Sequence, residues 1–253
     1  MERVVTRNSV RTDELSEVKS QFLATLNYEV RTPLTGILGM LDLLLETELT
    51  PEQREYAQDS RFCADSLLDI MNSTLEFSAL SANQVTLEEA ELPLLELLDT
   101  VLDEFSLKAA NKGLKFIRDM HDSVPEAVMG DAVRLKKLFS NLLENAVKFT
   151  KAGEIEVECS AVSAGYSGWL TFSVRDTGIG IPTDKLEWIF DSFHQLETGL
   201  NRRYTGMGLG LAVTQKIARL MNADISVETE IDQGSIFTLK IPFKISRESA
   251  VFQ

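Results

Sequence analysis

The sequence has few of the residues that build metal centres and disulfide frameworks. Its 253 residues include only two cysteines and two histidines. Cys63 and Cys159 lie far apart, without the short spacing of a zinc site, so we expect two buried thiols in a reducing compartment. No apolar run approaches bilayer length, and the N-terminus lacks a signal-peptide pattern. This predicts a cytoplasmic protein, or the cytoplasmic part of a membrane-anchored one whose membrane segments lie outside this stretch.

Positive charge is also scarce, since the net charge is −14. This argues against binding nucleic acid or an anionic membrane through a broad electrostatic surface. A nucleotide site needs only local positive charge and stays open. With 44% hydrophobic and 25% charged residues, the chain has the composition of an ordinary globular protein. Its length allows one large domain or two small ones.

The N-terminal third predicts helices. Residues 1–20 are polar and charged, typical of an incoming linker helix, and residues 21–82 predict a helical hairpin. Thr50 before Pro51 indicates the start of the second helix. Two amphipathic helices cannot bury both apolar faces alone, so we expect a homodimer in which two hairpins form a four-helix bundle. The two apolar stripes are Val30, Leu34, Ile37, Leu41 and Leu44, then Tyr56, Cys63, Leu67, Ile70, Thr74 and Phe77.

Beyond residue 83 the pattern changes to alternating helices and strands. Helices are expected at 92–110, 131–149, 186–193 and 208–221, and strands at 114–120, 154–162, 169–175, 225–230 and 235–243. Residues 194–205 lack periodicity and suit a lid. This predicts an α+β protein, in which the hairpin precedes a two-layer α/β sandwich at 83–246, and residues 247–253 form a disordered tail.

Two glycine clusters carry the strongest chemical signal. The first, at 176–182, has the sequence Asp-Thr-Gly-Ile-Gly-Ile-Pro, and the second, at 206–211, has the sequence Gly-Met-Gly-Leu-Gly-Leu. Glycines let backbone N–H groups approach phosphate oxygens, and a cluster that opens a helix adds the positive end of that helix. Asp176, which begins the first cluster, could accept a hydrogen bond from an adenine amino group.

A helix upstream of both clusters carries paired amides. Asn141 and Asn145 stand four residues apart and share one helix face, where two amide oxygens can meet one cation. Taken alone, such a pair is more often a polar helix face. Because both glycine clusters follow it, we favour a Mg-ATP site.

These segments resemble the boxes of sensor histidine kinases, in family order. Residues 22–34 resemble the H box, with Gly36 and Gly39 similar to the hybrid-kinase branch, and residues 189–193 resemble the F box. Residues 141–149, 176–182 and 206–211 match the N, G1 and G2 boxes. The resemblance covers about residues 15–243, and it implies the ATPase fold shared with Hsp90 and gyrase. Those other ATPases lack the hairpin.

The resemblance also implies roles for individual residues. Asn145 would hold Mg²⁺, with Asn141 beside it contacting phosphate or metal. Asp176 would accept a hydrogen bond from the adenine amino group. Arg202 and Arg203, in the lid, would reach the γ-phosphate. The nucleotide-binding set is Asn141, Asn145, Lys148, Phe149, Asp176, Gly178, Gly180, Arg202, Arg203, Gly206, Gly208 and Gly210.

The H box departs from the family at its central residue. Tyr28 stands where the family has its phosphate-accepting histidine, next to Glu29, the neighbouring base. A histidine nitrogen is nucleophilic near neutral pH, whereas a phenol, with an ordinary pKa of about 10, is almost wholly protonated. Glu29 and Thr32 also resemble a motif that orients a hydrolytic water in the family's phosphatase reaction. In the lid, Thr205 and Met207 depart from the family pattern too.

Three functions remain open. We favour a regulatory pseudokinase that binds Mg-ATP, does not autophosphorylate, and docks a response regulator or another histidine kinase; residual ATPase or phosphatase activity would be compatible with it. The second is an active kinase core carrying an engineered change from histidine to tyrosine at position 28. The third is an interaction module with a vestigial nucleotide site, which the intact Asn and Asp positions count against.

Overall fold

The computed structural model describes residue 25 and residues 28–82, 84–192 and 208–245. Its contacts divide into two compact units near residue 85, with Gly208 and Leu209 grouped with the first unit. Among the described residues, no helix is long and apolar enough to cross a membrane.

The first unit is a helical hairpin. One helix covers residues 28–45 and the second, α2, covers Pro51–Ser81. The start of α2 is set by a capping box: the Gln53 N–H donates to Thr50 Oγ1 (3.2 Å), and the Thr50 N–H donates to Gln53 Oε1 (3.1 Å). Arg54 closes the turn, since its guanidinium donates to the carbonyl oxygens of Leu45 and Thr47.

Polar contacts join the two helices, but the hairpin buries little apolar surface. Arg61 pairs with Asp42 at 3.0 Å, and Arg31 donates to Asn72 Oδ1. Between residues 28 and 82, the buried apolar side chains are Leu34, Ala57, Ala64 and Leu80. Cys63 is exposed, so the expectation of two buried thiols was wrong for it, because one helix packs against only one face of α2.

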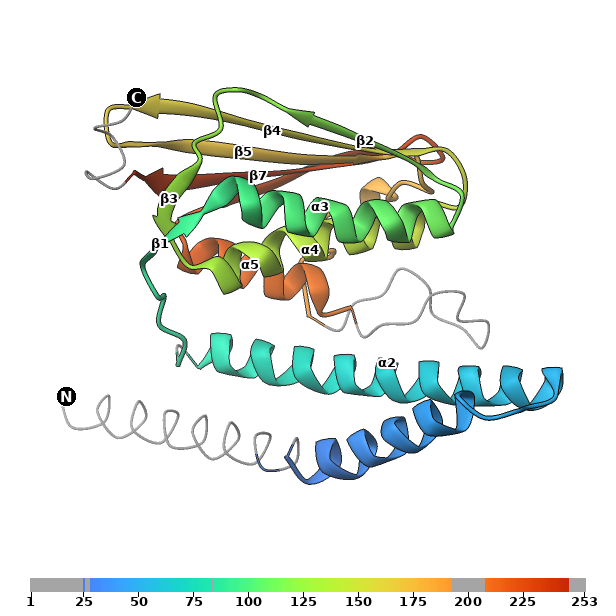
Figure 1. The fold of residues 1–253 in the computed structure, drawn as a ribbon. Helices are drawn as coiled ribbons and strands as arrows, with labels where there is room; N and C mark the ends of the chain where they lie inside the picture. The colour runs from blue at the N-terminus through green and yellow to red at the C-terminus, as the bar shows by residue number, and fades with distance from the viewer. Residues whose placement is uncertain (1–24, 26–27, 83, 193–207, 246–253) are drawn as a thin grey trace, which may run out of the picture. The chain divides into compact units, whose positions relative to one another are not determined.

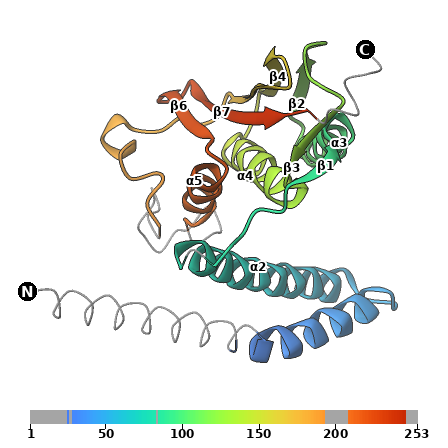
Figure 2. The same ribbon diagram turned by 90° about the vertical axis from the view of Figure 1, so that its left-hand side faces the viewer.

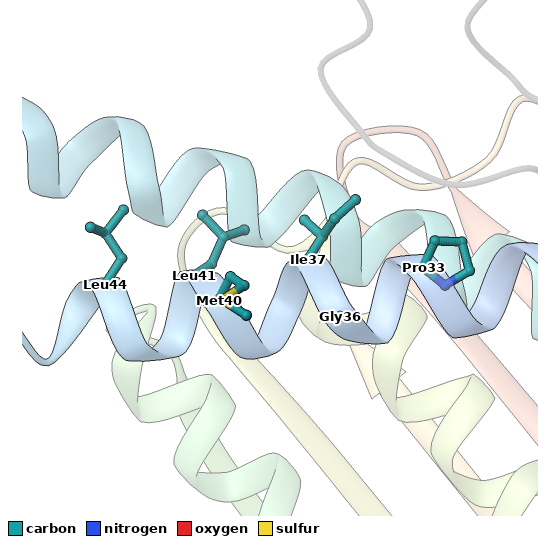
Figure 3. A pocket seen from close by; sticks show the side chains of 6 residues that line it. All are labelled: Pro33, Gly36, Ile37, Met40, Leu41 and Leu44. Carbon is teal, nitrogen blue, oxygen red and sulfur yellow. The ribbon is translucent and has the colours of Figure 1, made fainter.

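The first helix carries an open apolar groove. Two of its lining side chains are largely exposed: Ile37 is 51% exposed and Met40 is 71% exposed. Figure 3 shows the lining residues along this one helix. They are Pro33, Gly36, Ile37, Met40, Leu41 and Leu44.

The second unit is built on a seven-stranded mixed sheet. Its main path has the order β1-β3-β7-β5-β4-β2, and β6 pairs with β7. All neighbouring pairs are antiparallel except β2 with β4, which is parallel. The strands are β1 (Ala90–Pro93), β2 (Lys115–Met120), β3 (Ala127–Gly130), β4 (Glu154–Ala164), β5 (Ser167–Asp176), β6 (Asp224–Glu230) and β7 (Gly234–Lys244).

Three helices cover one face of this sheet, as Figures 1 and 2 show. They are α3 (Leu94–Asn111), α4 (Ala132–Phe149) and α5 (Gly210–Leu220). Alternate residues of β4 and β5 are buried, as expected for a sheet covered on one face. Phe139 of α4 and Phe172 of β5 meet across the two layers, with ring centroids 4.4 Å apart. The predicted fold class, a helical hairpin followed by a two-layer α/β sandwich, is confirmed.

Three local predictions were wrong or incomplete. Residues 186–192 form turns after a short 3₁₀ helix, η1 (Thr183–Lys185), and not the predicted helix. Their backbone hydrogen bonds join residues three positions apart, whereas an α-helix needs bonds between residues four positions apart. The helix expected from residue 92 begins at Leu94, because Leu92 and Pro93 pair with β3. The short strands β1 and β3 were missed.

Candidate functional site

Asp176 lies at the end of β5 and is buried. Its Oδ1 accepts a hydrogen bond from the backbone N–H of Gly178 at 2.8 Å, and the backbone N–H of Ser235 also bonds its carboxylate. Burial raises the pKa of Asp176 above its ordinary value, while the two backbone hydrogen bonds act in the opposite direction. A buried carboxylate fixed in this way is a strong acceptor for an N–H group of a ligand.

The glycines around Asp176 are required by close backbone contacts. A side-chain carbon at position 178 would lie 2.7 Å from Asp176 Oδ1 and 2.7 Å from the carbonyl oxygen of Phe149. Gly180 and Gly234 have positive φ angles of 64° and 104°, and a side chain at either would collide with backbone. The first glycine cluster therefore passes directly against the C-terminal end of α4.

That end of α4 holds polar groups without partners. Within the described residues, Asn145 Nδ2 and Thr150 Oγ1 are buried and have no hydrogen-bond partner. Buried polar atoms of this kind cost free energy unless a ligand or water satisfies them. The sequence pattern marked Asn145 but missed Thr150, which follows Phe149 as the C-cap of α4.

Lys148 supplies local positive charge beside these groups. It is half-buried, and its Nζ lies 5.3 Å from the centroid of the Phe149 ring. Burial lowers the pKa of Lys148, and the nearby Glu144 carboxylate acts in the opposite direction. An anionic ligand here would favour the charged form of the lysine.

Asn141 lies one helical turn before Asn145 and contacts the start of α5. Its Nδ2 lies 3.2 Å from the carbonyl oxygen of Gly210 and 3.0 Å from Thr214 Oγ1. Asn141 and Thr214 are both buried. The structure thus brings Asn141 and Gly210 together, through a threonine that sequence analysis did not consider. Thr214 follows Gly210 by four residues, and that helical spacing was the signal available.

The predicted residues of the hairpin are exposed. Tyr28 is 74% exposed, and Glu29 and Thr32 lie on the same helix. Thr32 Oγ1 donates to the carbonyl oxygen of Tyr28 at 3.1 Å, one turn earlier. The oxygen of Thr32 keeps lone pairs that can accept from a water molecule.

Several predicted residues cannot be assigned positions. Arg202, Arg203 and Gly206, like Thr205 and Met207, lie outside the described residues, whereas Gly208 is described and has a positive φ of 69°. Among the described histidine, cysteine and acidic side chains, no group of three is arranged to hold a metal ion. A cation here would depend on amide oxygens and on the ligand itself.

Two family matches follow the division of the chain. Residues 18–83 match the His Kinase A (phospho-acceptor) domain, and residues 130–245 match the histidine kinase-, DNA gyrase B- and HSP90-like ATPase. The chain belongs to the histidine kinase family. This catalytic core is 40% identical over 233 residues to the signal transduction histidine-protein kinase BarA of Escherichia coli K12, covering 91% of this chain and 25% of that protein.

Other relatives agree with that family. The sensor histidine kinase RcsC of Salmonella typhimurium is 37% identical over 96% of the kinase core and 25% of RcsC. The crystal structure of full-length ShkA in complex with AMPPNP is 36% identical, with a TM-score of 0.74, over 89% of this chain and 46% of ShkA. The kinase core therefore spans only about a quarter of the curated relatives named here. Together the matches support a protein of two-component signalling.

Proposed function

We propose that residues 86–245 bind Mg-ATP at the site bounded by Asp176, the C-terminal end of α4 and the start of α5. The observation that carries this proposal is the cradle at Gly178, where a side-chain carbon would touch both the Asp176 carboxylate and the end of α4. The base would lie over this cradle, with its amino group donating to Asp176. ShkA, a relative with the same fold, is described in complex with AMPPNP, an ATP analogue.

The residues present fit a polyphosphate and its cation. Asn141 and Phe149 are separated by eight positions, or about 12 Å of helix, a span that an extended nucleotide can follow. Lys148 would approach the phosphates as a point charge, and the glycines from 206 to 210 would offer backbone N–H groups. Asn145 would hold Mg²⁺, which prefers oxygen ligands and keeps several waters. When bound, Mg²⁺ would neutralise charge on the phosphates.

Calorimetry with ATP and Mg²⁺ tests the proposal directly. We expect micromolar-range binding that weakens when Mg²⁺ is chelated. Asp176→Asn should lower the affinity by roughly 10- to 100-fold, because an amide in the wrong orientation leaves the adenine amino group without its charged acceptor, worth about 1.5–3 kcal/mol.

Asp224→Asn is the matched control, because Asp224 is exposed at the start of β6. It should bind ATP like the wild type. If the wild-type chain binds no nucleotide, the vestigial-site alternative replaces our proposal. If Asp176→Asn binds normally, the adenine pocket lies elsewhere.

We further propose that this kinase core does not autophosphorylate, because Tyr28 occupies the phosphoacceptor position. It would act as a regulatory pseudokinase that docks a response regulator or another histidine kinase on its hairpin. The support is the tyrosine itself, together with the match of residues 18–83 to a phospho-acceptor domain. The alternative is an active kinase with an engineered tyrosine at this position.

Labelled ATP separates these possibilities. The chain as given should incorporate no acid-labile, base-stable phosphate. Tyr28→His should gain phosphohistidine if the nucleotide site and Glu29 are sound, since an imidazole with a pKa near 6.5 is a neutral nucleophile at pH 7. Tyr28→Phe is the control and should stay silent. Phosphohistidine in the wild-type chain would refute the assignment of Tyr28 to the phosphoacceptor position. If Tyr28→His binds nucleotide but incorporates no phosphate, the departures at Thr205 and Met207 would account for the missing activity.

The hairpin also supports a homodimer. Large apolar side chains remain exposed along its first helix, beside a groove that a second copy of the chain could cover. Two hairpins would then form a four-helix bundle. Such a bundle would carry Tyr28 and Glu29 on its exposed surface, where a partner protein could reach them.

A further inference from the structure

A closed set of three hydrogen bonds, one buried and two partly buried, joins α4 to the first turn of α5. Asn141 Nδ2 donates to the carbonyl oxygen of Gly210 (3.2 Å) and to Thr214 Oγ1 (3.0 Å), and the Thr214 hydroxyl donates to the same carbonyl oxygen (2.9 Å). Asn141 is 6% exposed and Thr214 is fully buried. The amide nitrogen therefore has two acceptors at α5, and the hydroxyl has one.

The two asparagines of α4 are in opposite states. Asn141 Nδ2 has two acceptors at α5, whereas Asn145 Nδ2 is buried without a partner in the described part of the chain. Their spacing alone made them an equivalent pair of ligands. The hydrogen bonds distinguish the two amide nitrogens, whereas the Oδ1 atoms, which would bind a cation, take part in none of these bonds.

The acceptor at Gly210 also indicates what the amide does. Nothing lies within 4 Å of the position where a side chain of Gly210 would begin, so Gly210 itself is not held by close packing on that side. The amide of Asn141 reaches the carbonyl of this residue and the side chain one turn later. The buried bond between Asn141 and Thr214 is costly to break from one side, because the remaining partner is left unsatisfied.

We propose that Asn141 is a positioning residue that holds the first turn of α5 against α4, and that Thr214 is its obligatory partner. Asn141 then acts on the nucleotide phosphates through the orientation of α5. This inference rests on the proposed nucleotide site. It makes Thr214, which was in no predicted set of site residues, a determinant of phosphate binding.

Thr214→Val provides the sharpest test. Valine keeps the shape of threonine and removes the hydroxyl, while Thr214→Ser keeps the hydroxyl and serves as the matched control. We expect Thr214→Val to bind a non-hydrolysable ATP analogue at least fivefold more weakly than the wild type. Adenosine, which has no phosphates, should bind both within twofold. Thr214→Ser should resemble the wild type with both ligands.

Asn141→Asp distinguishes positioning from metal binding. Aspartate retains an oxygen that can hold Mg²⁺, but it has no N–H groups for Gly210 and Thr214. Positioning predicts that Asn141→Asp loses affinity as severely as Asn141→Ala, by a similar factor with Mg²⁺ and with chelator. A ligand role predicts that aspartate preserves Mg²⁺-dependent binding, and that result would overturn the inference.

Further outcomes are equally decisive. Unchanged affinity of Thr214→Val for the ATP analogue would overturn the inference while leaving the proposed function intact, even if the melting temperature falls. Absence of nucleotide binding by the wild type would overturn both. Thermal unfolding checks that each variant is folded, and Thr214→Ala replaces Thr214→Val, with the same expectation, if valine prevents folding.

Discussion

The hairpin and the ATPase domain differ in how much apolar surface each buries within one chain. In the ATPase domain, three helices cover one face of a sheet, and residues such as Leu98, Phe139 and Leu239 are fully buried. In the described hairpin, only four apolar side chains are buried, and the larger of them are leucines. The hairpin instead relies on its capping box, the Arg54 contacts at its turn and the Arg61–Asp42 pair.

This difference identifies the hairpin as the unit that association would stabilise. A domain that encloses its own core can fold alone, whereas a pair of helices with an exposed apolar side gains stability from association. It also separates the chemistry. The Asp176 carboxylate of the ATPase domain is buried and accepts from the backbone N–H groups of Gly178 and Ser235, while Tyr28 and Glu29 lie on an exposed helix.

The largest expected effect comes from charging the apolar groove of the hairpin. Ile37→Glu combined with Met40→Glu should convert a dimer to a monomer, because two like-charged groups per chain would enter the interface. Light scattering should then report half the wild-type mass. Nucleotide binding should persist, since the ATPase domain has its own core.

Gln58→Glu is the control for added charge, because Gln58 is exposed on α2 and is not part of the groove. It should remain dimeric. A wild-type chain that is already monomeric would contradict the bundle, and a double variant that stays dimeric would show that the interface lies elsewhere.

Replacing glycine by alanine should change the free energy of unfolding in opposite directions in the two regions. Gly178→Ala should destabilise the ATPase domain by about 1–3 kcal/mol, because its side chain would overlap Asp176 and the end of α4. Gly39→Ala should stabilise the hairpin by about 0.5–1 kcal/mol, because Gly39 is exposed in a helix with nothing within 4 Å.

Urea unfolding of each variant measures both effects. Nucleotide affinity should fall in Gly178→Ala and stay unchanged in Gly39→Ala. A stable Gly178→Ala protein with full affinity would mean that the cradle is not rigid.

The sequence predicted the elements that have long, regular patterns. Hydrophobic periodicity agrees there with the residues that begin or end an element. These elements are the helix capped at Thr50, the asparagine helix and the paired strands β4 and β5. Short elements were lost. The strands β1 and β3 have four residues each and are defined by their pairing with each other, which no local pattern reports.

The residue types of the proposed site could be read from the sequence, but the contacts between them could not. Glycine spacing and an aspartate identified the first cluster, because chemistry limits which residues fit there. The role proposed for Asn141 rests on contacts with residues about seventy positions away, at Gly210 and Thr214. The helix predicted at 186–193 was wrong for a related reason. Apolar residues can have helical spacing without the backbone hydrogen bonds of an α-helix.

A smaller effect should appear in the stability of the ATPase domain at Asp176. The raised pKa of Asp176 means that the folded state disfavours its charged form, so a stability penalty appears as pH rises through the folded pKa and vanishes below the unfolded value. Asp176→Asn should therefore raise the melting temperature at pH 7 relative to the wild type. The gain should shrink as the pH approaches about 4, near the ordinary pKa of aspartate. A constant difference across this range would contradict the assignment.

The smallest effect leaves stability unchanged and concerns the two thiols. Cys63 is exposed on α2, whereas Cys159 is buried in β4, where burial raises the pKa of its thiol to about 12. Because the thiolate is the reactive form, Cys159 should be inert in the folded chain and react only on unfolding. A thiol reagent should thus modify one cysteine per native chain and two in denaturant. Cys63→Ser should abolish the native reaction, and a second native thiol would contradict the closed core of the ATPase domain. If Cys63 is protected in the wild type but reacts in the Ile37→Glu, Met40→Glu variant, the dimer itself covers it, and the contrast between the two regions becomes a contrast between a core made within one chain and a core made between two.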